Sequence, residues 1–448
     1  MKFQEFKELV IARAKDLALE EYELYYECAE STSVSAFQQE LNEFSSAVSG
    51  GVCFRAIVDG KMGYASTEDL SAESAAALVD KAVENAAILE SQEQVFLGEG
   101  GQTYQVIDRK MPDLPATEVL IAKALESQKA LYAADPAVMD GTATNIFSER
   151  MEVAICNSKG LDLSCTRSLS GLVPQAVVSD GKEMSDSYDI RIGDLETMDL
   201  NAVAAKVVKK AIQKLGGDVA PTSVCPVVFS PEAMASLLAT YSPVFSSENA
   251  QKGLSRLNGQ EGQVIASPAV TLVDDPFCEL SAMPMAFDAE GSPTYKKNII
   301  DGGTLQTLLY NLKTANVAGK ATTGNGSKGS YNASVGISPF TMYLAPGKYT
   351  EEELLRKAGT GVYINSLNGL HAGANPVSGD FSLQSGGFLI ENGRKTAPVK
   401  SFTVAGNFFQ LLKSITAVGS NLEVPNPSGV TGFGSPSVLV ETLSIAGK

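Results

Sequence analysis

The sequence predicts an α+β fold, with an N-terminal helix-and-hairpin α/β domain followed by a mainly-β domain that has a few short helices. Three observations lead to this prediction. The first half alternates helical apolar stripes with strand-like runs, the second half is rich in glycine and hairpin turns, and 448 residues are too many for one core. Apolar residues make up 44% of the chain and charged residues 19%, an ordinary globular balance.

The N-terminal half begins with a helix and continues with strands. Apolar residues recur at helical spacing over 3–17, and charges interrupt that segment too often for a signal peptide. Strands are expected over 22–29, over 34–48 and on both sides of Asp59-Gly60, which is a hairpin turn signal. A helix capped by Ser71 follows.

This order of elements returns later in the chain. Asp180-Gly181 repeats the turn signal, and an alanine-rich helix follows it again. We interpret the pattern as a weak internal duplication, with units at about 20–95 and 145–218 joined by a helical linker. Glycines and prolines over 215–226 mark the expected domain boundary, which divides the chain into 1–218 and 219–448.

The C-terminal half shows hairpin signals and few helices. Turns are expected at Asp301-Gly302 and Asn392-Gly393. Helical patterns are few: they occur near 230–241, 349–359 and 407–419, and the segment 312–321 is also helix-like.

Charge and cysteine usage restrict the class of protein. The formal net charge is −17, which disfavours direct DNA binding, and we interpret the basic segment 206–214 as the solvated face of a helix. The six cysteines form no C-x-x-C pair, as is typical of a reducing compartment. With no apolar run long enough to span a membrane, the expected location is the cytoplasm.

Motifs that carry chemistry are scarce. A catalytic triad or an imidazole-bound zinc ion would have to use the single histidine, His371, in a loop rich in glycine and asparagine. GNGSKG at 324–329 fits a dinucleotide motif, but the helix that should follow it is not predicted, so we interpret it as a flexible loop. The remaining candidates are acids near strand ends, where turn formation is favoured over metal binding. They are Asp274, Asp275, Asp288, Glu290, Asp380 and Glu391.

The C-terminal half nevertheless resembles a known family. The string GANPVSGDFSLQSGGFLIENGRKTAPVKSFTVAGNFFQLLKSITAVGSN is similar to the C-terminal signature of the TldD/PmbA family, and TLVDDP, FDAEG and ATTGNGS follow the family's order. The resemblance extends over essentially the whole chain. It implies a cytoplasmic role in proteolysis, and the family's historical label is modulator of DNA gyrase.

The resemblance also identifies a degenerate zinc motif. TldD-like members carry an HExxxH helix and a later cysteine ligand, whereas PmbA (TldE)-like members lack both and pair with TldD. The matching stretch here is VVFSPEAMASLLATY, in which Glu232 takes the place of the glutamate. Pro231 and Ser236 then occupy the histidine positions, and no later cysteine follows. No catalytic residue and no metal ligand are therefore expected in this chain.

The resemblance implies a non-catalytic PmbA/TldE-like subunit of a zinc metalloprotease complex that degrades or processes small or unfolded peptides. Zinc is expected in a TldD-like partner, and a homodimer of the isolated chain is compatible with the family. His371, Asp380 and Glu391 are the candidates to line a substrate cleft. Two alternatives stay open, an independent metal-dependent peptidase with an unrecognised site and a regulatory binding protein of the gyrase-modulator type.

Overall fold

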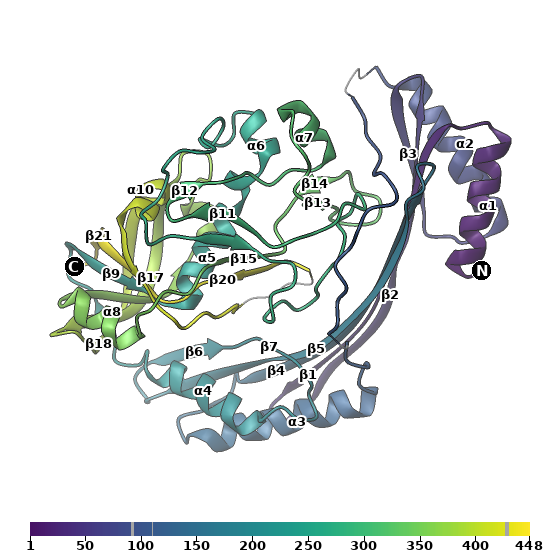
Figure 1. The fold of residues 1–448 in the computed structure, drawn as a ribbon. Helices are drawn as coiled ribbons and strands as arrows, with labels where there is room; N and C mark the ends of the chain where they lie inside the picture. The colour runs from purple at the N-terminus through teal and green to yellow at the C-terminus, as the bar shows by residue number, and fades with distance from the viewer. Residues whose placement is uncertain (91–93, 110, 426–429) are drawn as a thin grey trace.

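The computed structural model describes residues 1–90, 94–109, 111–425 and 430–448. A long curved sheet forms the N-terminal half, and the C-terminal half lies against the concave face of that sheet (Figure 1). Helices within these ranges fall short of the length and apolarity needed to cross a membrane.

The long sheet has the strand order β3-β2-β1-β4-β5-β6, and β7 pairs with β5. Its strands are β1 (Glu21–Phe37), β2 (Glu40–Val58), β3 (Lys61–Thr67), β4 (Ala143–Asn157), β5 (Asp162–Ser179), β6 (Met184–Tyr188) and β7 (Arg191–Ile192). β1 and β4 pair antiparallel in the middle of the sheet. β2 and β3 follow β1 outward to one edge, and β5 and β6 follow β4 outward to the other edge. The repeated order of elements that the sequence suggested is therefore present.

Helices cover the convex face at both ends of this sheet (Figure 1). They are α1 (Phe3–Asp16), α2 (Ala72–Ile88), α3 (Thr117–Ala134) and α4 (Leu200–Ile212). Alternating strand residues are buried against them: Leu24 and Phe54 pack under α1 and α2, while Ile146 and Leu172 pack under α3 and α4. Ser71 caps α2 as predicted, because its Oγ accepts a hydrogen bond from the N–H of Ser74.

The tight turns confirm part of the sequence analysis. Asp59-Gly60 joins β2 to β3, and Asn392-Gly393 joins β17 (Asp380–Glu391) to β18 (Arg394–Asn407) in the C-terminal half, with φ positive at all four residues. The segment 34–48 contains a hairpin turn that was not predicted. Gln38 and Gln39 turn the chain with φ of 50° and 61°, although glutamine gives no turn signal.

Two sheets organise the C-terminal half. The larger has the order β19-β21-β9-β16-β17-β18-β8, and an additional pairing of β18 with β21 closes five of its strands into a ring. Its strands are β8 (Asp218–Val219), β9 (Ser223–Phe229), β16 (Gly361–Asn368), β17 (Asp380–Glu391), β18 (Arg394–Asn407), β19 (Ile415–Val418) and β21 (Val438–Ala446).

The second sheet has the order β12-β11-β10-β15-β20, and a small pair β13-β14 lies apart from it. These strands are β10 (Leu272–Asp274), β11 (Lys297–Asp301), β12 (Thr304–Leu305), β13 (Gly326–Ser327), β14 (Gly336–Ile337), β15 (Thr341–Leu344) and β20 (Gly432–Gly434). The helices are α5 (Pro231–Tyr241), the 3₁₀ helix η1 (Ser242–Phe245), α6 (Ser247–Gln251), α7 (Leu312–Ala318), α8 (Glu351–Ala358), α9 (Leu370–Gly373) and α10 (Phe408–Ser414). The mainly-β character expected for this half is confirmed.

The two halves share a buried contact. Phe287 packs on Tyr25, Ile155 and Leu161 from the concave face of the long sheet. The short strand β8, which ends the predicted N-terminal domain, pairs with β18 of the C-terminal sheet. The division at residue 218 stays a prediction.

Candidate functional site

Helix α5 carries the stretch that we predicted to be a degenerate zinc motif, and its start is well defined. The Oγ of Ser230 accepts a hydrogen bond of 3.2 Å from the N–H of Ala233, and Pro231 takes the first helical position. Ala233, Met234, Leu237, Leu238 and Tyr241 are buried in the C-terminal core. The sequence therefore fixes this helix firmly between the two C-terminal sheets.

The motif positions do not fit a zinc ion. Pro231 has no atom that can bind a metal. The Glu232 carboxylate forms an ion pair with Lys210 of α4, and the Ser236 hydroxyl donates to the backbone carbonyl of Glu232 at 2.8 Å. No cluster of three or more His, Cys, Asp or Glu side chains able to hold a metal occurs within the described ranges. One neutralised carboxylate and one engaged hydroxyl make an inadequate ligand set.

A half-buried polar cluster lies near this helix. The Glu351 carboxylate accepts hydrogen bonds from Lys395 at 2.6 Å, Tyr363 at 2.8 Å and Ser437 at 2.9 Å. Burial by itself would raise the pKa of Glu351, but Lys395 and the two hydroxyls together hold it below its usual value. The cluster joins α8, β16 and β18 to Ser437, the residue before β21, so its role in the structure is to hold these segments together.

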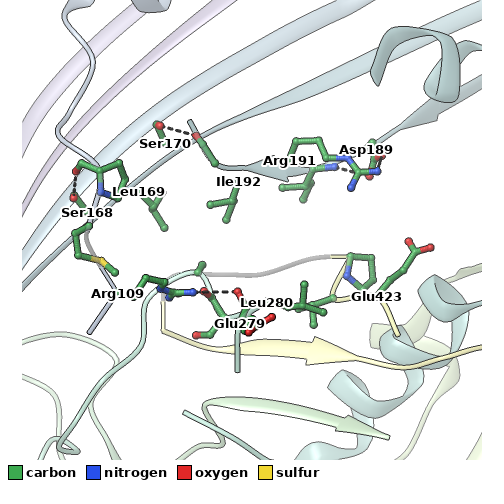
Figure 2. Close-up of a pocket in the computed structure, with 18 of the residues that line it drawn as sticks. Arg109, Ser168, Leu169, Ser170, Asp189, Arg191, Ile192, Glu279, Leu280 and Glu423 are labelled. Atoms are coloured by element: carbon green, nitrogen blue, oxygen red, sulfur yellow. Dashed lines mark hydrogen bonds and ion pairs between the residues drawn. The ribbon is translucent and has the colours of Figure 1, made fainter. Parts of the chain in front are cut away.

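A cleft of about 510 Å³ opens between the edge of the long sheet and the C-terminal half (Figure 2). Its lining comprises Arg109, Met111, Pro112, residues 168–170 of β5, residues 189–193 around β7, Lys206 of α4, the loop 279–282 and the segment 422–425. In Figure 2, Ser168, Ser170, Arg191 and Asp189 lie along one wall and Arg109, Glu279 and Glu423 along the other. Sequence analysis did not identify this site, because its walls come from segments far apart in the chain.

Several charged side chains of the cleft interact with their neighbours. Arg109 donates to the carbonyl oxygens of Glu279 at 3.1 Å and Ser281 at 2.8 Å. Asp189 pairs with Arg191 at 2.6 Å and with Lys206 at 3.5 Å. Among the described lining residues, the cations Arg109, Arg191 and Lys206 equal in number the carboxylates Asp189, Glu279 and Glu423, so the cleft is suited to hold a hydrogen-bonding chain without a strong net charge.

One wall of the cleft is an open strand edge. On the side of β5 away from β4, β6 pairs with residues 175–179 and β7 with Gly171 and Leu172. No strand of the described chain covers that side of β5 over 162–169. The carbonyl of Ser170 accepts from the N–H of Gly193, so the backbone groups of Ser168, two residues earlier, point to the same open side. An extended peptide could pair there.

The three predicted cleft residues lie elsewhere, since none of them is in this lining. His371 is exposed on α9, and Asp380 accepts a hydrogen bond from Asn407 at 2.8 Å. The hydrogen bond from Asn407 is the main reason why the pKa of Asp380 lies below its usual value. Glu391 lies at the other end of β17, so the structure separates it from the first two. Their role stays a prediction.

The remaining acids serve the core. Asp274 is fully buried and accepts hydrogen bonds from Asn325 at 2.8 Å, from the N–H of Phe340 at 2.8 Å and from Lys297 at 3.1 Å. Asn325 belongs to the GNGSKG segment, and it is also fully buried. The interpretation of that segment as a flexible loop is wrong in its first half, because its amide side chain completes a buried hydrogen-bond network.

The lysines of 206–214 are not a free basic face either. Lys206 pairs with Asp189 and Lys210 with Glu232, while Lys214 donates to a carbonyl of β6 at 2.7 Å. Burial lowers the pKa of Lys214. Three of these lysines therefore bind neighbouring elements, and the expectation of a merely solvated face has to be corrected.

Family models match nearly the whole chain. The PmbA/TldA metallopeptidase C-terminal domain matches residues 222–447, the central domain matches 110–215 and domain 1 matches 22–86. The chain belongs to the TldD/PmbA metallopeptidase family. This confirms the resemblance, and it places the protein in a peptidase family.

Relatives of full length support the same assignment. The chain is 26% identical to a metalloprotease PmbA homologue of Haemophilus influenzae over 93% of this chain and 90% of the relative. It is 25% identical to a metalloprotease of Methanothermobacter thermautotrophicus over 93% of both.

Solved structures share the fold. A Thermotoga maritima protein described as a candidate modulator of a DNA gyrase superposes with a TM-score of 0.90 at 29% identity, covering 99% of this chain and 100% of that one. TldE from Thermococcus kodakarensis superposes with a TM-score of 0.87 at 24% identity, covering 98% and 99%, which supports the fold alone.

Proposed function

We propose that this chain is a non-catalytic, PmbA (TldE)-type subunit of a cytoplasmic protease complex that acts on small or unfolded peptides. The observation that carries the proposal is the chemistry of α5. Pro231, Glu232 and Ser236 stand where a zinc-binding member would have its motif, and they offer no ligand set for the metal. A TldD-like partner supplies the zinc centre and hence the activated water.

The contribution of this chain is a surface for the peptide. The open edge of β5 supports main-chain pairing with little dependence on sequence, as an unfolded substrate requires. The cationic and carboxylate side chains of the described lining are equal in number, which suits a peptide without a strong net charge. We therefore place the peptide in the cleft of Figure 2, beside residues 168 and 169 at the end of the open edge.

Cleavage by separate and mixed subunits tests the subunit role. Fluorogenic unfolded peptides are incubated with this chain, with the TldD-like protein and with an equimolar mixture of the two. We expect cleavage by the mixture that EDTA abolishes, and no cleavage by this chain alone. Zinc in a one-to-one ratio in the purified chain, together with EDTA-sensitive activity, would favour the independent peptidase instead.

A single proline substitution at the strand edge tests the peptide site separately. Ser168→Pro removes the outward N–H while leaving the pairing of β5 with β4, much as the native Pro174 does in the same strand. We expect the KM of the mixture to rise about tenfold or more, which corresponds to roughly 1.4 kcal/mol. Ser168→Ala is the matched control, because it removes the hydroxyl contact to Pro112 but keeps the N–H. Equal KM values for native and proline proteins, at equal thermal stability, would exclude this edge.

A further inference from the structure

A second pocket, the β3 pocket, has a volume of about 450 Å³ and lies away from the cleft of Figure 2. That cleft is lined from β5 and β7, whereas the β3 pocket is lined from β2 and β3, toward the opposite edge in the strand order. Its facing wall comes from α6, α7 and residues 334–335, which lie at the same end of the molecule as β3 (Figure 1). This volume is typical of a site for a small molecule.

The buried arginine of the β3 pocket has fewer hydrogen-bond partners than its guanidinium group can use. Arg55 is 4% exposed, and its Nε donates to Oε1 of Glu23 at 2.7 Å. Nη2 lies 2.5 Å from the same oxygen, but it makes no well-aligned hydrogen bond to a described residue. Nη1 donates to the sulfur of Met62 at 3.8 Å, and a thioether is a weak acceptor. Because unmatched buried donors are costly, this guanidinium calls for a further acceptor.

A carboxyl group in the same lining adds another donor. Burial, and then repulsion from Asp288, raises the pKa of Glu290 from 4.5 to about 8. Most of this group is therefore protonated at pH 7, and its O–H can donate a hydrogen bond. Its Oε2 already accepts from the N–H of Leu312 at 2.7 Å. The β3 pocket thus combines two buried groups that donate, and a ligand with acceptor oxygens would match them.

The charge of the lining favours a ligand with one negative charge. The described lining contains four cationic side chains and two carboxyl groups, whereas the whole chain has 35 Lys and Arg against 52 Asp and Glu. Two of the cations already interact with other groups, since Lys252 pairs with Glu248 at 2.7 Å and Lys313 also has a partner. Lys61 makes no ion pair with a described residue. The four cations are Arg55, Lys61, Lys252 and Lys313, and the two carboxyl groups are Glu248 and Glu290.

The rest of the lining includes apolar side chains, so the ligand needs an apolar body as well as a charge. These side chains are Met62, Leu89, Val95, Phe96 and Val335. A guanidinium group matches the planar fork of a carboxylate, and one carboxylate carries the single charge that the lining favours. We propose that the β3 pocket binds a small organic carboxylate with an apolar body, such as an N-acylated amino acid or the C-terminal residue of a short peptide, with its carboxylate against Arg55.

Calorimetric titration of the full-length chain tests this proposal without any cleavage assay, so its outcome is independent of the proposed function. The probes are N-acetylleucine, N-acetylphenylalanine, their C-terminal amides and inorganic phosphate. We expect one molecule of an acid to bind per chain, and the amides and phosphate to bind about tenfold more weakly or worse. A hexapeptide that ends in leucine separates the two sources, because it will bind at least as well as N-acetylleucine if the pocket takes a peptide terminus. Absence of binding by both acids, or equal binding of acid and amide, would overturn the proposal.

Two variants locate the binding site. Arg55→Lys keeps a positive charge beside Glu23 but removes the planar fork, so the Kd for the acid should rise about tenfold or more. Lys61→Glu leaves the buried ion pair untouched and should raise the Kd about fivefold or more. Lys182→Glu is its matched control, because Lys182 is exposed in the second Asp-Gly-Lys turn and the net charge changes equally.

The control also separates a local effect from a general one. Lys182→Glu should leave the Kd for the acid unchanged, since this turn lies outside the lining of the β3 pocket. Equal effects of Lys61→Glu and Lys182→Glu would show that net charge alone matters and would overturn the proposal. An unchanged Kd in Arg55→Lys, at a thermal stability equal to that of the native chain, would overturn it too.

Discussion

Replacing Glu290 by glutamine should stabilise the protein at alkaline pH. The side chain is 4% exposed, and its Oε2 accepts a hydrogen bond of 2.7 Å from the N–H of Leu312. Burial, followed by repulsion from Asp288, raises the pKa of Glu290 from 4.5 to about 8. A carboxyl with a raised pKa contributes stability that is complete below its unfolded pKa and is lost as the pH rises through the folded value.

The size of the effect follows from linkage. A rise of about 3.5 in pKa corresponds to a ceiling of about 5 kcal/mol, at about 1.4 kcal/mol for each unit of pKa. Glutamine keeps an oxygen for the N–H of Leu312 and carries no charge, but its amide is still desolvated. We therefore expect Glu290→Gln to gain about 1–3 kcal/mol over the native protein at pH 8–9, and close to nothing near pH 4.5.

Urea unfolding at several pH values between 4.5 and 9 measures this gain. Asp288→Asn is the matched control, because Asp288 accepts from the N–H groups of Glu290 and Ser292 at 2.9 Å and of Gly326 at 2.7 Å. Asparagine has only one acceptor oxygen, so this variant should lose about 1–3 kcal/mol. A Glu290→Gln protein no more stable than the native one at pH 8–9, or a gain that does not grow with pH, would refute the reasoning.

Three further substitutions probe other contacts. Arg55→Met leaves the carboxylate of Glu23, which is 1% exposed, without its ion-pair partner. Unfolding experiments should show that the free energy of unfolding falls by about 3–5 kcal/mol. A second change, Glu23→Gln, should restore part of this loss. Asn407→Ala removes the N-cap of α10 and the hydrogen-bond donor to Asp380. Calorimetry should record a loss of stability of about 1–3 kcal/mol, and an unchanged Tm would contradict this. Gly387→Ala would place a Cβ 1.8 Å from a carbonyl oxygen of β16. The yield of folded protein should therefore fall sharply. Normal yield and stability would show that β16 and β17 can move apart to accept the methyl group.

Turns and helix starts could be predicted wherever a short stretch of sequence determines the backbone conformation. Asp59-Gly60 and Asn392-Gly393 predicted their turns because type I′ geometry requires positive φ, which asparagine, aspartate and glycine tolerate. Ser230-Pro231 predicted the start of α5 for an equally local reason. The turn at Gln38-Gln39 was missed, because there the pairing of β1 with β2 and β4 determines the backbone rather than the residues of the turn.

The residues that line the cleft could not be predicted in this way. Arg109, Asp189, Glu279 and Glu423 carry no local signature, and only the fold brings them to one cleft. Pro174 is no signal for the open edge over 162–169, because β6 and β7 pair with β5 on either side of it and its carbonyl accepts from the N–H of Asp189.

By itself, the sequence determined the family, the α+β composition and the inventory of side chains from which any metal site would have to be built. These properties depend on residue identity and on spacing along the chain. Only the tertiary structure decided which strand edges stay open, which carboxylates are neutralised and where the cleft lies. Pairing partners and burial arise from contacts between residues distant in sequence, and no local pattern encodes them.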